Sequence, residues 1–121
     1  MKRFYDQTLV ETYLQQTKFA SVMNGLQKHL FVAQYEKGEF VTMPVQKEQL
    51  FQIIIEGSVS IYFIRDDGSV YSLANGREDD LLGEMEIFSH QLSNVYAESN
   101  ADVSCIVTLE ANIRARRLKI A

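Results

Sequence analysis

The spacing of apolar residues changes near position 31 of the 121-residue chain. Before that point, apolar side chains recur every three or four positions, which is the spacing of one face of an α-helix. These apolar positions are Leu9, Val10, Tyr13 and Leu14, followed by Val22, Leu26 and Leu30. The pattern predicts helices over residues 5–30 that pack their apolar stripes against the rest of the protein, with Asp6 or Thr8 capping the first helix.

After position 31, apolar and polar residues alternate over short stretches, which is typical of β-strands. The segments "LFVAQYEKGEFVTMP", "QLFQIIIEGSVSIYFIR" and "NVYAESNADVSCIVTL" each contain such stretches. Turns are expected at Lys37-Gly38, Glu56-Gly57, Asp67-Gly68 and Ser99-Asn100. Pro44 indicates a loop or an edge strand. About seven or eight short strands joined by such turns predict a small sandwich, barrel or jelly roll.

The composition indicates one globular domain. Hydrophobic residues make up 46% of the chain, and one proline and six glycines are too few for a linker. No apolar run approaches the roughly 20 residues that a membrane span needs, and "MKRFYDQTLVETYLQQ" lacks the apolar core of a signal peptide. Cys105 is the only cysteine, which excludes a disulfide framework and predicts a buried small hydrophobe. These features predict a cytoplasmic protein.

The charge is negative overall and unevenly distributed. A formal net charge of −4 argues against this chain itself gripping a nucleic-acid backbone, which needs clustered lysine and arginine. The C-terminal "IRARRLKIA" is nevertheless basic, and it has two interpretations. It is either a nucleic-acid patch or the first turns of a helix with Ile113, Leu118 and Ile120 on one side. We favour the helix, and a chain that stops inside a helix predicts that more protein follows.

The histidines, the cysteine and the carboxylates are the candidates for catalysis or metal binding. The two histidines, His29 and His90, form no H-x-H pair of the kind that a cupin metal site needs. Cys105 has no evident histidine partner, and no phosphate-binding loop occurs. Glu84 and Glu86 are either an acid–base pair on one strand face, a solvated acidic turn, or the source of one pocket carboxylate. We therefore expect no enzyme, no metal and no cofactor.

Several segments, in order, resemble a known family. They are "YEKGEFV", "FQIIIEGSVSIYF", "DDGS", "LLGEMEIF" and "VYAESNADVSCIVTL", with glycines at Gly38, Gly57, Gly68 and Gly83. Over about residues 31–110 this series resembles the cyclic-nucleotide-binding domain, and the Crp/Fnr-type bacterial transcription regulators are the nearest branch.

The resemblance implies a mainly β fold with flanking helices, namely a double-stranded β-helix or jelly-roll β-roll. The organisation would be an N-terminal helical segment over 1–30, a sensor roll over 31–110, and the start of a dimer helix over 111–121. In the family, that helix forms the interface of a homodimer, and a winged helix-turn-helix domain that follows it binds DNA. This DNA-binding domain would lie beyond the present sequence.

The resemblance also implies a ligand site. The family's phosphate-binding cassette begins with Gly-Glu, which matches Gly83 and Glu84, and the glutamate accepts a hydrogen bond from the ribose 2′-hydroxyl. A helical turn starting at Met85 would direct backbone N–H groups at the phosphate. The family's phosphate-neutralising arginine should follow, but "SHQLSNVYA" contains no arginine or lysine. The positions that fall there are Gln91, Leu92 and Ser93.

A cyclic phosphate buried near Glu84 and Glu86 without a cation would lose several kcal/mol to desolvation and repulsion. Tight cAMP binding is therefore not expected. A small organic effector remains an open alternative, and Tyr62 and Tyr71 are the expected lining of its cavity. The main hypothesis is an effector-sensing domain of a Crp/Fnr-type regulator. The alternatives are a ligand-free interaction or dimerisation module and a cupin-like enzyme, against which the missing H-x-H counts.

Overall fold

The structure is a computed structural model that describes residues 1–43, 50–82 and 95–115. Its helical elements are α1 (Gln7–Leu14), the 3₁₀ turn η1 (Gln27–His29) and α3 (Glu110–Ala115). Its strands are β1 (Lys2–Phe4), β2 (Phe31–Tyr35), β3 (Phe40–Thr42), β4 (Leu50–Glu56), β5 (Val59–Ile64), β6 (Val70–Gly76), β7 (Leu81–Leu82), β8 (Val95–Ser99) and β9 (Val103–Leu109).

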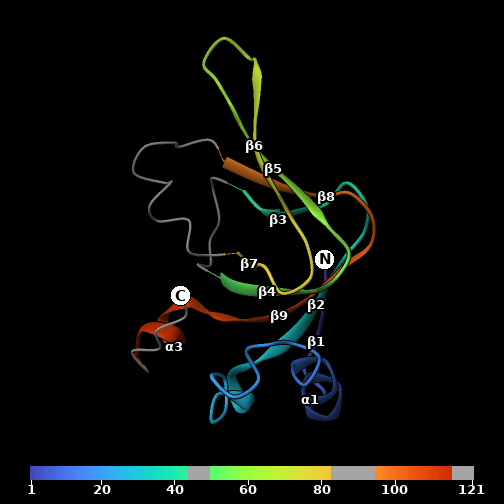
Figure 1. Cartoon of the computed structure of the whole chain (residues 1–121), viewed down its shortest axis with the longest axis vertical. Helices are drawn as coiled ribbons and strands as arrows, with labels where there is room; N and C mark the ends of the chain where they lie inside the picture. Colours follow the sequence, from blue (N-terminus) through green and yellow to red (C-terminus); the bar gives the residue numbers. More distant parts are fainter. Residues whose placement is uncertain (44–49, 83–94, 116–121) are drawn as a thin grey trace.

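Two antiparallel sheets form a roll (Figure 1). One sheet has five strands in the order β1-β2-β9-β4-β7, and the other has four in the order β3-β8-β5-β6. The helical elements lie outside the roll, with α1 below the five-stranded sheet and α3 at the end of β9 in the view of Figure 1. The predicted mainly β jelly-roll architecture with flanking helices is confirmed.

Strand β4 separates two hydrophobic cores because its side chains alternate between two covered faces. Ile53 and Ile55 pack with α1 and the N-terminal segment, in a cluster that includes Leu14. Ile54 points the other way, into the interior between the sheets, where it joins Cys105. This two-sided burial explains why Ile53, Ile54 and Ile55 form a continuous apolar run within β4 rather than an alternating pattern.

Three of the predicted turns depend on glycine in the left-handed backbone region. Gly38, Gly57 and Gly68 have φ values of +89°, +91° and +85°. Only at Gly57 is space also limiting, because a Cβ there would lie 2.4 Å from the backbone oxygen of Asp102. The β4–β5 and β8–β9 connections therefore meet at Gly57, and the expected turns at Glu56-Gly57 and Asp67-Gly68 are confirmed.

The prediction of helices throughout residues 5–30 is confirmed only for α1 and the short η1. Residues 15–25 form turns instead. The hydroxyl of Thr17 donates to the carbonyl oxygen of Leu14 and accepts from the amide of Phe19, which competes with continuation of the helix. Gly25, with φ +96°, adds a second interruption. The apolar stripe still packs as expected, since Leu26 is 1% exposed.

The chain also begins with a strand that the sequence pattern did not reveal. Strand β1 pairs with β2 and is only three residues long, too short to show an alternation. At the other end, α3 agrees with the helix expected from residue 111 onward as far as Ala115. Pro44 and residues 116–121 lie outside the described residues. In the parts of the chain that the structure describes, no helix has the length and apolarity of a membrane span.

Candidate functional site

A tight turn directs the chain along β4 and into the predicted ligand segment. The amide of Arg77 donates to the Asp80 carboxylate at 2.9 Å, and the Asp80 amide donates back to the Arg77 carbonyl at 2.9 Å. Asp79 takes a positive φ of 69°, and its amide donates to the carbonyl of Ile54. The turn is thus held by its own side chains and by β4. It places Leu82, which is 2% exposed, inside the roll.

The segment that follows Leu82 connects the two sheets. Leu82 pairs with Gln52 in the five-stranded sheet, and Val95 pairs with Phe63 in the four-stranded sheet. The predicted cassette residues Gly83, Glu84, Met85, Gln91, Leu92 and Ser93 all fall in this segment, and they lie outside the described residues. His90 also lies there. The structure describes the two residues that flank this segment, Leu82 and Val95.

A buried polar link joins the two sheets next to this point. Gln52 is 1% exposed, and both its side-chain oxygen and its side-chain nitrogen are hydrogen-bonded. The hydroxyl of Tyr35 donates to Gln52 Oε1 at 2.6 Å, and Gln52 Nε2 donates to the carbonyl oxygen of Val41 at 2.9 Å. Burial raises the pKa of Tyr35 well above its ordinary value, so its hydroxyl stays a donor. The link connects β2 and β4 to β3 of the opposite sheet.

Tyr62, an expected pocket-lining residue, lies on the outer face of the four-stranded sheet. On β8, Ala97 and Ser99 are buried, so Tyr96 and Glu98 face the other way. Tyr62 shares their face: its ring stacks on Tyr96 at a centroid distance of 5.6 Å, and its hydroxyl donates to Glu98 at 2.8 Å. Burial and this hydrogen bond raise the pKa of Tyr62 to about 12.

Tyr71, the second expected lining residue, lies on β6 opposite Phe63. It is 50% exposed, its ring contacts Phe63 at 5.2 Å, and the guanidinium of Arg65 lies 4.9 Å above it. The structure therefore does not bring Tyr62 and Tyr71 together. Among the described residues, no group of three histidine, cysteine or carboxylate side chains is arranged to hold a metal ion.

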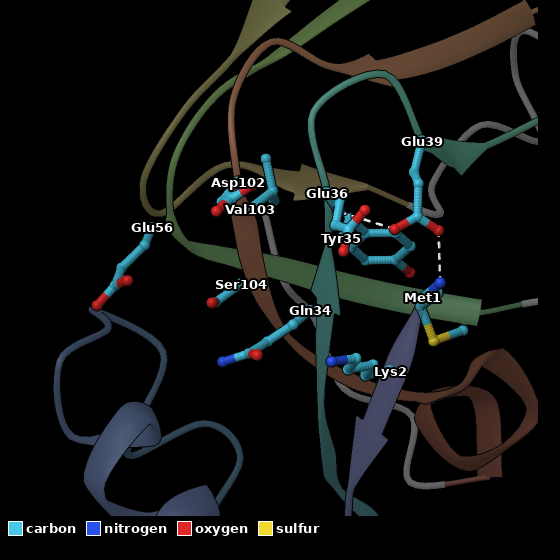
Figure 2. Close-up of a pocket in the computed structure, with 10 residues that line it drawn as sticks. All are labelled: Met1, Lys2, Gln34, Tyr35, Glu36, Glu39, Glu56, Asp102, Val103 and Ser104. Atoms are coloured by element: carbon cyan, nitrogen blue, oxygen red, sulfur yellow. Dashed lines mark hydrogen bonds and ion pairs between the residues drawn. The ribbon is translucent and has the colours of Figure 1, made fainter.

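A hollow of about 610 Å³ lies where the start of β1, the end of β2, the end of β4 and the start of β9 come together, and no sequence motif marked it (Figure 2). It is lined by Met1, Lys2, Gln34, Tyr35, Glu36, Glu39, Glu56, Asp102, Val103 and Ser104. The N-terminal ammonium forms an ion pair with Glu39, which also accepts the amide of Glu36. These contacts hold the pKa of Glu39 below its usual value.

Most of the chain matches a known domain family. A model of the cyclic nucleotide-binding domain matches residues 32–115, which is most of the chain and includes β3 to β9 and all of β2 except its first residue. The chain belongs to the cyclic nucleotide-binding domain family. The resemblance recognised from the glycine series is thereby confirmed at the level of the domain.

Solved structures share the fold of this cyclic nucleotide-binding domain. The regulatory subunit of a cAMP-independent protein kinase A from Trypanosoma brucei, as a triple mutant with cAMP in its A site, has a TM-score of 0.71 and 18% identity over 90% of this chain and 42% of its own. The Trypanosoma cruzi subunit, bound to guanosine, has a TM-score of 0.71 and 16% identity over 90% and 40%. Oxidised CprK with o-chlorophenolacetic acid has a TM-score of 0.57 and 19% identity over 89% and 38%.

The domain spans about two fifths of the length of these solved chains. At such identities the likeness concerns the fold of the cyclic nucleotide-binding domain. No curated protein matches the sequence.

A long stretch of this sequence carries no basic residue other than histidine. Between Arg77 and Arg114 the sequence contains no lysine or arginine. This stretch includes all of β7, β8 and β9 and the segment that joins β7 to β8. Arg77 itself lies in the turn before β7, with its backbone bonded to Asp80. The segment between β7 and β8 therefore contains no lysine or arginine.

Proposed function

We propose that the chain is an effector-sensing regulatory domain rather than a catalyst, and that its effector is not cAMP. The observation that supports this is the absence of lysine and arginine between Arg77 and Arg114, in a cyclic nucleotide-binding domain. An arginine–phosphate contact is about twice as strong as a neutral hydrogen bond. A phosphate brought next to Glu84 without that contact would be both desolvated and repelled.

The proposed ligand site consists of Gly83, Glu84, Met85, Gln91, Leu92 and Ser93. Glu84 would accept the ribose 2′-hydroxyl, a contact that needs no phosphate. An uncharged nucleoside keeps this contact and removes the need for a cation, so it is the first candidate effector. The guanosine complex of the cAMP-independent kinase subunit from Trypanosoma cruzi supports the plausibility of such a ligand on this fold.

Substitution at the proposed arginine position tests this assignment. We expect Gln91→Arg or Leu92→Arg to strengthen cAMP binding by roughly tenfold or more, because a charge-assisted contact is gained. Binding of guanosine should not gain from the same change, since guanosine carries no phosphate. The Trypanosoma brucei mutant that holds cAMP includes a substitution to arginine, which supports this design. Leu92→Met is the matched control, and calorimetry with both ligands is the measurement.

Failure of both arginine variants to improve cAMP binding would contradict the proposed position of the phosphate site. Tight cAMP binding by the unmodified chain would contradict the proposal itself. The two results are distinguishable because the first is measured on the arginine variants and the second on the wild-type chain.

The larger protein is proposed to be a Crp/Fnr-type transcription regulator that forms homodimers and binds DNA through a further domain. The ordered glycine series and the fold shared with CprK support this assignment. The reading frame downstream of Ala121 tests it: a helix-turn-helix domain is expected there. A kinase-inhibitory segment or a second cyclic nucleotide-binding domain would contradict it.

A ligand-free interaction module is the second candidate. The observation that favours it is the filled interior between the sheets, where Val59, Ala97 and Cys105 are each fully buried. A thermal-shift screen with nucleosides, nucleotides and small aromatic acids separates the two functions. An increase in melting temperature with any of these favours the sensor, and no increase with all of them favours the module.

A further inference from the structure

Three aromatic side chains form a row across the outer face of the four-stranded sheet. They are Phe40 on β3, Tyr96 on β8 and Tyr62 on β5, which are adjacent strands. Val41, next to Phe40, is buried in the interior, so Phe40 faces outward with the two tyrosines. The ring centroids of Phe40 and Tyr96 are 5.2 Å apart, and those of Tyr96 and Tyr62 are 5.6 Å apart. This aromatic row is therefore a continuous surface of packed rings.

The aromatic row lies away from the helices. In the part of the chain that the structure describes, α1 and α3 pack on β2, β4 and β9 of the other sheet, on the far side of the roll (Figure 1). Phe40 is 37% exposed. Val70 on β6 is 64% exposed and pairs with Ile64, two positions beyond Tyr62, so it extends the same face. Outer faces of antiparallel sheets usually carry polar residues, whereas aromatic residues are enriched at interfaces, so this face fits a partner.

The aromatic row has a carboxylate beside it. Glu98 on β8 pairs with Phe40 on β3 and faces outward. One of its oxygens accepts the hydroxyl of Tyr62 at 2.8 Å. Among the described residues, no lysine or arginine forms an ion pair with Glu98. A basic side chain of a partner would pair with this carboxylate and lie over the rings, whose faces attract cations. The surface therefore favours a positively charged partner.

The size of the face suits a short peptide better than a second folded copy of the chain. Its four strands have between three and seven residues, so the face measures roughly 300 Å² at about 4.8 Å between strands and about 3.4 Å per residue. A stable interface between folded proteins buries about 800 Å² per partner. The backbones of β5 and β8 are paired within the sheet, so the face offers rings rather than backbone hydrogen bonds. A peptide bound here must leave its own backbone groups in water.

We infer that the aromatic row binds a proline-rich peptide of about five residues that carries an arginine or a lysine. A polyproline II helix has no internal hydrogen bonds and a solvated backbone, and aromatic-lined surfaces of other folds bind such segments. Five residues at about 3.1 Å each span about 15 Å, which matches the roughly 14 Å across three strand spacings from β3 to β6. Glu98 would pair with the basic residue of the peptide.

This surface does not depend on the proposed nucleoside site. The aromatic row belongs to β3, β5 and β8, whereas the residues of the proposed nucleoside site follow β7 in the sequence. Failure of one proposal therefore leaves the other standing.

The test is an NMR titration of the isotope-labelled 121-residue chain with the peptide acetyl-Pro-Pro-Arg-Pro-Pro-amide. We expect amide shifts to change in β3, β5 and β8. An analogue with alanine in place of each proline should bind roughly tenfold more weakly, because more backbone freedom is lost on binding. An analogue with glutamate in place of arginine should also bind roughly tenfold more weakly, because the ion pair is replaced by repulsion.

Three results would overturn the inference. The first is no shift change in these strands with the proline peptide. The second is equal binding of the alanine analogue. The third is a set of shift changes in β3, β5 and β8 that appears when the chain alone is concentrated, which would show that a second copy occupies the face.

Two variants assign the contacts. Tyr96→Ala should weaken binding of the proline peptide roughly tenfold, because the middle ring of the row is lost. Tyr71→Ala is the matched control: Tyr71 is 50% exposed on the same sheet, but its ring contacts Phe63, which faces the opposite side from Tyr62. An unchanged spectrum away from β8 checks that the fold is retained. Equal effects of Tyr96→Ala and Tyr71→Ala would contradict the assignment.

Glu98→Gln tests the carboxylate. The glutamine side-chain oxygen can still accept the hydroxyl of Tyr62, so only the charge is removed. We expect this variant to lose the preference for the arginine peptide over its glutamate analogue. Glu78→Gln, which changes an exposed carboxylate on the turn before β7, is the control and should keep the preference. A preference that survives Glu98→Gln would contradict the role of Glu98.

Discussion

At the scale of single residues, Gly57 differs from the turn glycines Gly38 and Gly68 because it combines a positive φ with a close backbone contact. Gly57→Ala should lower the free energy of unfolding by roughly 3 kcal/mol, because a left-handed non-glycine residue costs about 1–2 kcal/mol and the new methyl group also clashes. That methyl would lie 2.4 Å from the Asp102 carbonyl oxygen. Urea denaturation measures the effect.

Gly68→Ala is the matched control for this prediction. Gly68 has a similar φ of +85°, but a Cβ there would meet nothing within 4 Å. Its substitution should therefore show only the backbone cost of about 1–2 kcal/mol. Equal losses for the two variants would show that the contact with Asp102 does not constrain the β4–β5 turn.

Gln52 is a second residue whose environment makes a definite prediction. Gln52→Leu should cost about 3 kcal/mol, because it leaves the Tyr35 hydroxyl and the Val41 carbonyl unpaired inside the protein. In that background, Tyr35→Phe should cost little or restore stability, since the unpaired hydroxyl is then gone. Chemical denaturation of the four proteins in the double-mutant cycle measures the coupling. Additive losses would contradict the proposed link.

The buried thiol of Cys105 predicts a loss of stability at alkaline pH. Burial raises the pKa of Cys105 from 9.0 to about 12 in the folded protein. Its contribution is complete below pH 9 and is lost as the pH rises toward 12, because only the unfolded thiol ionises in that range. Relative to Cys105→Ala, the wild type should lose about 1.4 kcal/mol per pH unit there. Parallel pH profiles of unfolding free energy for the two proteins would contradict this.

At the scale of elements, α1 depends on its cap because it is only eight residues long. The Asp6 carboxylate accepts the amides of Thr8 at 2.8 Å and Leu9 at 3.4 Å. Asp6→Ala should lower the unfolding free energy by about 1 kcal/mol, whereas Asp6→Asn, which keeps the cap, should cost much less. Thermal unfolding compares the two. A loss as large in the asparagine variant would indicate that charge rather than capping stabilises α1.

Most of the strands and turns could be predicted from the sequence because their signals are local, whereas the three-residue β1 could not. The pairs Glu56-Gly57 and Asp67-Gly68 predicted turns, and the structure has both glycines at positive φ. The helical prediction over residues 5–30 was less accurate, because Thr17 forms local side-chain hydrogen bonds just after the end of α1. A hydroxyl that competes with the backbone leaves the apolar spacing unchanged, so the pattern could not show it.

At the scale of the whole molecule, membership of the cyclic nucleotide-binding domain family could be recognised from the spacing of the glycines, and the family match confirms it. The polar hollow could not be recognised. Its lining includes Lys2, Gln34, Ser104 and Glu56, which are brought together only by strand register. Each is an ordinary polar residue in its own segment, so no local motif marks the set.

We propose that this cyclic nucleotide-binding domain does not bind cAMP tightly, because its proposed ligand segment has no lysine or arginine. The most direct test is isothermal titration calorimetry of the unmodified chain with cAMP. We expect either no measurable binding or a dissociation constant weaker than the low micromolar range, because no lysine or arginine occurs between Arg77 and Arg114. A dissociation constant in the low micromolar range or below would contradict it.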